Sequence, residues 1–109
     1  MTNITLFWNP EGLRGLESKG HSGNARKGED VVCAAISSLV QALLLGLQEV
    51  AQIEDLVFDI DSSVPAISMK WPRTDVKELD LLTRTIARSL KEIASGYPGY
   101  VSITEVHLT

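Results

Sequence analysis

Residues 20–37 read GHSGNARKGEDVVCAAIS, and the elements on either side are arranged around this stretch. Its first half is small and polar, and an apolar run begins at Val31. Gly28 and Glu29 interrupt regular structure, while the carboxylate of Asp30 can accept hydrogen bonds from the exposed amides of a first helical turn. The stretch therefore predicts a loop that leads directly into a helix, with Asp30 as the N-cap and Cys33 as the third residue after it.

Cys33 is the single cysteine of the chain, and the predicted helix places it in the first turn. Unpaired N–H groups and the positive end of the helix dipole favour a thiolate there. His21 stands 12 positions earlier, so a loop that folds back brings its imidazole beside the sulfur. Because the thiolate is the nucleophilic form of cysteine, the pattern predicts a catalytic pair of His21 and Cys33.

An inert thiol is the other interpretation of Cys33. A lone cysteine is usually a small buried hydrophobic residue, and Val32, Ala34 and Ala35 around this one are apolar. A lone histidine is also more often structural than catalytic. The residues by themselves leave both interpretations open, although a histidine, a glycine-bearing loop, a capping acid and a cysteine in combination favour catalysis.

The loop of residues 22–29 is small and polar, so we expect it to be mobile and to close over a substrate. Ser22, Gly23 and Gly28 are its candidate substrate-contacting residues, and a plain connector is the alternative. The two glycines also have the spacing of a phosphate-binding loop. However, Glu29 and Asp30 stand where that motif needs lysine and serine or threonine.

The chain before this stretch predicts a β-hairpin. Ile4, Leu6 and Trp8 alternate with a more mixed set of residues, which is typical of a strand with one apolar face. Asn9-Pro10-Glu11-Gly12 has the preferences of a tight turn. Residues 13–19 return as a second strand in which Gly15 is a candidate bulge, and His21 then lies on the rim of the sheet.

The helix that begins at Asp30 is predicted to continue to about Ile53. Its polar residues form one narrow stripe, so we expect burial on more than one side and a subunit interface. Gly46, opposite that stripe, predicts a close approach to the sheet or to another helix. A membrane span is the competing interpretation, but residues 31–47 are interrupted by polar side chains and fall short of the ~20 apolar residues required. The stripe consists of Ser37, Gln41, Gln48 and Gln52.

Two further strands are predicted next. Residues 56–61 alternate in polarity, and a fourth strand that contains Ile67 and Trp71 follows a short turn. Asp59 and Asp61 share one face of the third strand, which could suggest a metal site. No histidine or further acid stands close enough in sequence to complete a set of metal ligands, so we expect a solvated face and no metal.

The second helix is amphipathic. Thr74 or Asp75 can cap its start, Gly96 and Pro98 end it, and residues 100–107 then form a fifth strand. We expect its basic side chains simply to be solvated; these are Lys77, Arg84, Arg88 and Lys91.

The order of these elements is ββαββαβ, which predicts an α/β (α+β) two-layer sandwich with a mainly antiparallel sheet and both helices on one face. The 109 residues suit a single domain, 1–109. A net charge of −4 argues against binding nucleic acid through its phosphates. One cysteine forms no internal disulfide, and the N-terminus shows no secretory signal, so we expect a cytoplasmic protein without a membrane anchor.

Two parts of the central stretch resemble the signature of the Prp family of ribosomal-processing cysteine proteases. They are Gly20-His21-Ser22 and Gly28-Glu29-Asp30-Val31-Val32-Cys33-Ala34-Ala35-Ile36-Ser37. The family motif reads approximately Gly-His-Ala, a short variable loop, and Gly-x-Asp-Ile-Val-Cys-Ala-Ala-Val-Ser. Ser22 replaces the commoner small apolar residue, and the other departures are conservative.

This resemblance implies that His21 and Cys33 form the catalytic dyad. It further implies a homodimeric cysteine endopeptidase without a cofactor. Its implied substrate is the N-terminal extension of a bacterial large-subunit ribosomal protein, cut after an aromatic residue in support of ribosome assembly.

Two other classes remain open from the residues. One is a noncatalytic ribosome-associated binding module in which Cys33 is merely packed. The other is a redox or acyl-transfer protein that uses the same thiolate, although no second cysteine is present to resolve a disulfide.

Overall fold

A computed structural model of the chain describes residues 1–20, 29–61, 66–72 and 77–108. These residues form the predicted order ββαββαβ, with a short π-helix, η1, continuing the first helix. The elements are β1 (Thr2–Asn9), β2 (Gly12–Lys19), α1 (Glu29–Leu45), η1 (Gly46–Val50), β3 (Val57–Asp61), β4 (Ala66–Lys70), α2 (Lys77–Gly96) and β5 (Val101–His107).

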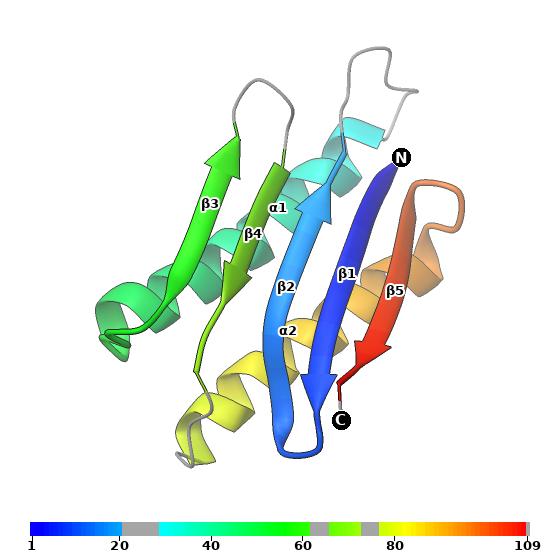
Figure 1. The fold of residues 1–109 in the computed structure, drawn as a ribbon. Coiled ribbons are helices and arrows are strands. Elements are labelled where there is room, and N and C mark those ends of the chain that lie inside the picture. The colour runs from blue at the N-terminus through cyan, green and yellow to red at the C-terminus, as the bar shows by residue number, and fades with distance from the viewer. Residues whose placement is uncertain (21–28, 62–65, 73–76, 109) are drawn as a thin grey trace.

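The five strands form one sheet in the order β3-β4-β2-β1-β5. The β1–β2, β2–β4 and β3–β4 pairs are antiparallel, and β1–β5 is parallel. Both helices lie on the same face of the sheet (Figure 1). The parallel pair arises because α2 carries the chain from β4 across β2 and β1 before β5 begins. The two-layer, mainly antiparallel prediction is confirmed.

The β1–β2 hairpin follows the turn chemistry of the sequence. The side-chain oxygen of Asn9 accepts a hydrogen bond from the backbone N–H of Glu11 at 3.0 Å. Gly12 has φ +151°, a value that favours glycine. Phe7 pairs with Gly15 and Trp8 with Leu13, so Arg14 is the extra residue of a bulge beside the predicted Gly15.

The core lies between the sheet and the two helices. Trp71, just past β4, is 5% exposed, and its indole N–H donates to the carbonyl of Leu13 at 2.8 Å. The positions predicted from alternation and helical spacing supply most of the remaining core. The largest fully buried side chains are Ile4, Leu6, Leu13, Leu16, Ile36, Leu43, Leu47, Met69, Leu90 and Val40.

Helix α1 begins at Glu29, one residue earlier than predicted. Asp30 therefore lies in the first turn rather than at the N-cap, and Cys33 stands four residues after the start of the helix. The side chain of Asp30 is outside the described residues, so whether its carboxylate accepts helix amides stays a prediction. At the other end η1 finishes at Val50, and Gln52 leaves the helix with φ +53°.

Within a single chain, the described side chains of α1 and η1 are buried on one side of the helix. The expected burial on more than one side is therefore not observed there. Val32, Ile36, Val40, Leu43 and Leu47 face the core. The run Val31–Val50 does reach the length and composition of a membrane span, contrary to the estimate from the sequence, and 33% of its most apolar window is buried. The buried stripe of this run belongs to the hydrophobic core of the domain.

Gly46 allows the two helices to approach closely. A Cβ built on Gly46 would lie 2.9 Å from Cδ2 of Leu82 on α2. The predicted role of this glycine is confirmed, and the neighbour is the second helix rather than the sheet.

Three of the four basic residues of α2 that we expected simply to be solvated are paired with carboxylates, which corrects that expectation. Arg84 binds Asp80 at 2.8 Å, and Arg88 binds Glu92 at 2.8 Å. Lys91 binds Glu105 of β5 at 2.7 Å, and the indole of Trp8 donates to the same carboxylate at 3.0 Å. The hydrogen bond from Lys91 lowers the pKa of Glu105 from its usual 4.5, against a smaller opposing effect of partial burial.

Strand β3 is an edge of the sheet, and all five of its residues are exposed. Asp59 and Asp61 are thus on a solvated strand. No three His, Cys, Asp or Glu residues gather as metal ligands within the described ranges. The predicted turn at 62–65 and the predicted helix cap at Thr74 or Asp75 lie outside those ranges.

Gly20, directly after β2, packs tightly against the start of β1. A Cβ at this position would lie 2.8 Å from Cα of Thr2 and 2.9 Å from its hydroxyl oxygen. Because the nearest atom belongs to the backbone, a side-chain movement cannot relieve the contact.

Replacing Gly20 by alanine is therefore expected to lower the free energy of unfolding by about 1–3 kcal/mol, the usual range for an overpacked site. Urea unfolding of the variant and the wild type measures this difference. Gly96→Ala is the matched control, because no atom lies within 4 Å of a Cβ built there. Equal stabilities for Gly20→Ala and the wild type would contradict the tight packing.

Candidate active site

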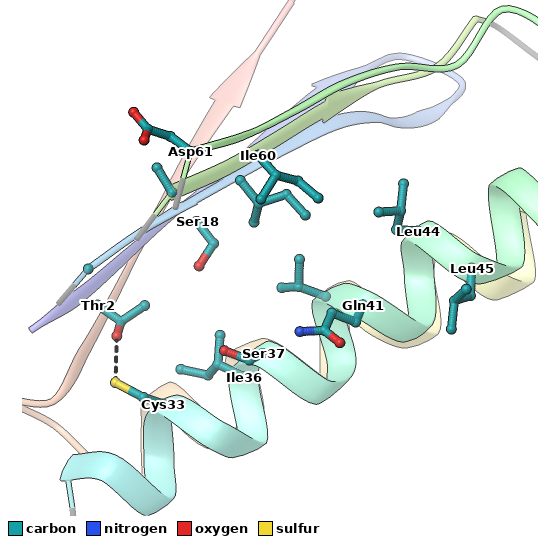
Figure 2. A pocket seen from close by; sticks show the side chains of 14 residues that line it. Thr2, Ser18, Cys33, Ile36, Ser37, Gln41, Leu44, Leu45, Ile60 and Asp61 are labelled. Carbon is teal, nitrogen blue, oxygen red and sulfur yellow. Dashed lines mark hydrogen bonds between the residues drawn. The ribbon is translucent and has the colours of Figure 1, made fainter. Parts of the chain in front are cut away.

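Cys33 lies just past the first turn of α1, where its side chain meets the beginning of β1. Side chains on a helix tilt toward its N-terminus, so the sulfur lies over the first turn. The Sγ atom is 3.2 Å from the hydroxyl oxygen of Thr2, as the dashed line in Figure 2 marks. Cys33 is partly buried, whereas Thr2 is only 5% exposed. The thiol therefore lies at the margin of the core, not within it.

Three separate segments meet at this point. The backbone N–H of Thr2 donates to the carbonyl of Tyr100 at 2.9 Å, and Thr2 pairs with Val101 of β5. On the other side, Gly20 lies against Thr2. The sheet thus supplies a rigid wall for the start of α1.

A groove of about 540 Å³ runs from Cys33 between α1 and the β2–β4–β3 side of the sheet. Figure 2 shows Cys33 at one end, with Leu44 and Ile60 projecting into the space farther along. The lining residues are Thr2, Ser18, Gly20, Cys33, Ile36, Ser37, Val40, Gln41, Leu44, Leu45, Ile60, Asp61, Ala66 and Ile67. Most of these side chains are apolar, so the groove suits an apolar segment of a ligand.

Polar groups occur at intervals along the same groove. Ser37 and Gln41 belong to the polar stripe of α1, and Ser18 comes from β2. Hydroxyl and amide groups at such positions can hydrogen-bond the backbone of an extended peptide. The groove therefore combines apolar walls with donors and acceptors, as a peptide site does.

Several groove residues were not identified from the sequence. Thr2 and Ser18 gave no signal because their partners are far away in the chain. Ile60 was placed on a strand by its alternation, but alternation does not reveal that β3 lies next to α1. The sequence pattern placed Ser37 and Gln41 in a polar stripe but gave neither of them a role.

The remaining predicted site residues lie outside the description. His21, Ser22, Gly23 and Gly28 fall in residues 21–28, so the distance between imidazole and sulfur is not measured. The pairing of His21 with Cys33 and the roles of the loop residues stay predictions.

His107, the other histidine of the chain, stands at the opposite end of the sheet. It pairs with Trp8, whereas Thr2 pairs with Val101. Six residues of strand separate the two pairs, which is about 20 Å. His107 is therefore too far from Cys33 to act on its sulfur.

The comparisons with known proteins agree with this arrangement. A family model described as "Cysteine protease Prp" matches residues 1–102. The chain is 34% identical over 92 residues to the ribosomal processing cysteine protease Prp of Mycoplasma genitalium, covering 83% of this chain and 86% of that protein. It is 29% identical over 90 residues to the Mycoplasma pneumoniae protein of the same name, with 83% and 85% covered.

Solved structures share the fold. The essential ribosomal processing protease Prp from S. aureus in complex with a substrate peptide has a TM-score of 0.85 at 19% identity, covering 96% of this chain and 99% of that one. SMU.848 from Streptococcus mutans has a TM-score of 0.87 at 22% identity, with 99% and 96% covered. The family model matches nearly the whole chain, and the cysteine lies at the end of a groove. This chain therefore belongs to the Prp family of cysteine proteases.

Proposed function

We propose that this protein is an endopeptidase that removes the N-terminal extension of a bacterial large-subunit ribosomal protein in the cytoplasm. The observation that carries the proposal is the position of Cys33 at one end of an apolar groove with polar groups along it. The names of the relatives, which describe ribosomal processing, support the choice of substrate.

Cys33 acts as the nucleophile in this proposal. Its thiolate attacks the peptide carbonyl carbon and forms a C–S bond, and the negative charge moves to the carbonyl oxygen. Amides of the first turn of α1 can stabilise this oxyanion. The C–N bond then breaks, the amine leaves with a proton from imidazolium, and a thioester remains.

His21 supplies and recovers the protons. It takes the proton of the thiol to give the ion pair, protonates the leaving amine, and removes a proton from the water that hydrolyses the thioester. The chain has two histidines, and His107 is about 20 Å from Thr2 along the strands. This leaves His21 as the candidate base. Gly20, its neighbour in sequence, lies against Thr2, whose hydroxyl contacts the sulfur.

The groove supports an apolar recognition sequence. Ile36, Val40 and Leu44 from α1 face Ile60 and Ile67 from the sheet. A large apolar or aromatic side chain of the extension would bury its surface there at roughly 25 cal/mol per Å². Cleavage after an aromatic residue fits such a site.

Purified protein is expected to cut the extension from the ribosomal protein with a chelator present, as mass spectrometry of the products would show. Cys33→Ser should abolish cleavage, because a serine hydroxyl is not ionised by the same surroundings. His21→Ala should lower the rate by roughly 10²–10⁴, the usual contribution of a general acid–base group.

Ser38→Ala is the matched control for these variants. The Ser38 hydroxyl donates to the carbonyl of Ala34 at 2.9 Å on the exposed side of α1, so cleavage should be unchanged. Asp30→Asn should also keep much of the activity if Asp30 serves the helix end. Cleavage by Cys33→Ser at the wild-type rate would exclude the protease mechanism, and binding without cleavage by the wild type would favour the noncatalytic ribosome-associated module.

We further propose that the protein is a homodimer through the outer side of α1 and η1. Val31, Leu45 and Val50 are 71%, 50% and 84% exposed there. Glu49 is the only charged residue between positions 31 and 50. A second copy can therefore cover this surface without bringing many like charges together, as a two-fold contact requires.

Light scattering should give twice the protomer mass for the wild type. Val50→Asp should shift the protein toward the monomer, because dimerisation would bury the new carboxylate. Leu81→Asp is the control, since Leu81 is 69% exposed on α2. A wild-type monomer at high concentration would refute the dimer and leave the proteolytic proposal intact.

A further inference from the structure

The hydroxyl of Thr2 is a buried polar group whose hydrogen-bond partner is the sulfur of Cys33. The residue is 5% exposed, and its oxygen lies 3.2 Å from Sγ. A buried hydroxyl without a partner is costly, so buried hydroxyls are nearly always hydrogen-bonded. A neutral thiol is a weak donor and a weak acceptor, whereas a thiolate accepts a much stronger, charge-assisted hydrogen bond.

The backbone holds this hydroxyl in place from both sides. Thr2 pairs with Val101 of β5 and donates its N–H to Tyr100, and Gly20 closes against its Cα and its oxygen. A β-branched side chain on a strand also has few rotamers. The sheet therefore holds the hydroxyl in a position that points toward the sulfur. This side chain is already ordered before the thiolate forms.

We infer that Thr2 is a positioning residue that donates its hydroxyl hydrogen to the Cys33 thiolate and holds the sulfur at the end of the groove. The inference rests on the proposed nucleophilic role of Cys33. When the sulfur attacks a carbonyl carbon, its negative charge passes to the carbonyl oxygen, and the hydroxyl keeps its own proton throughout. Thr2 therefore stabilises the attacking sulfur through a hydrogen bond and exchanges no proton with the substrate.

The other titratable residues of the groove and of the start of α1 are the same in every variant of the test. Asp61 from β3 lines the groove, and Glu29 and Asp30 belong to the first turn of α1. His21 is the proposed partner from the loop. Because none of these is altered, a change in the pH dependence of thiol reactivity reports the hydroxyl of Thr2.

The experiment measures the rate of alkylation by iodoacetamide from pH 5 to pH 10 in the full chain. Thr2→Val keeps the shape and removes the hydroxyl. We expect its rate near pH 7 to fall roughly threefold to tenfold, as loss of one hydrogen bond to a charged group implies. The deficit should vanish at high pH, where the thiol ionises without help, and Thr2→Ser should recover most of the wild-type rate.

Thr83→Val is the matched control, since Thr83 is 2% exposed on α2 and its hydroxyl donates to the carbonyl of Asp80 at 3.3 Å. It should alkylate like the wild type. Peptide cleavage by Thr2→Val should show a lower kcat with KM nearly unchanged, because valine leaves the groove wall in place.

Two results would overturn the inference. One is a Thr2→Val profile that matches the wild type at every pH. The other is a rate lowered by the same factor at every pH, which is the signature of a displaced sulfur rather than a lost hydrogen bond. The cleavage assay tests the proteolytic proposal separately. If that proposal fails, Cys33→Ser still cleaves the peptide, and the alkylation profiles are unaffected.

Discussion

The packing of α1 against the sheet is the contact on which the rest of the structure depends. Val32, Ile36, Val40 and Leu43 recur at helical spacing and bury one stripe of the helix. Cys33 follows Val32 by one residue, about 100° around the helix, and so lies at the border of that stripe. The half-buried position of the sulfur is thus a direct result of how the helix is seated.

The strand order separates the reactive end of the domain from a strongly paired end. Thr2 and Gly20 come together at one end of β1, next to the start of α1. At the other end, Trp8, Lys91 and Glu105 join β1, α2 and β5 through an ion pair and an indole hydrogen bond. Thr2 and Trp8 are about 20 Å apart along β1, so changes at one end need not disturb the other.

Local patterns were enough to predict the elements and their order, because alternation, helical spacing and turn residues act over a few positions. The Asn9–Gly12 turn and the close approach at Gly46 are examples. The helix start was misplaced by one residue, since Asp30 is as acceptable in a first turn as at an N-cap. The contact of Thr2 with Cys33 and that of Lys91 with Glu105 could not be predicted, because they depend on which strands become neighbours. The role of His21 stays a prediction.

The charge pattern of β3 bears on how the protein behaves at high concentration. Phe58 and Ile60 pair with Met69 and Ile67, so they share the helix-facing side, while Asp59 and Asp61 alternate with them on the opposite side. A further strand added in register from another copy would place carboxylates next to carboxylates, which is unfavourable. The two aspartates therefore disfavour in-register addition of another strand at the open edge of the sheet.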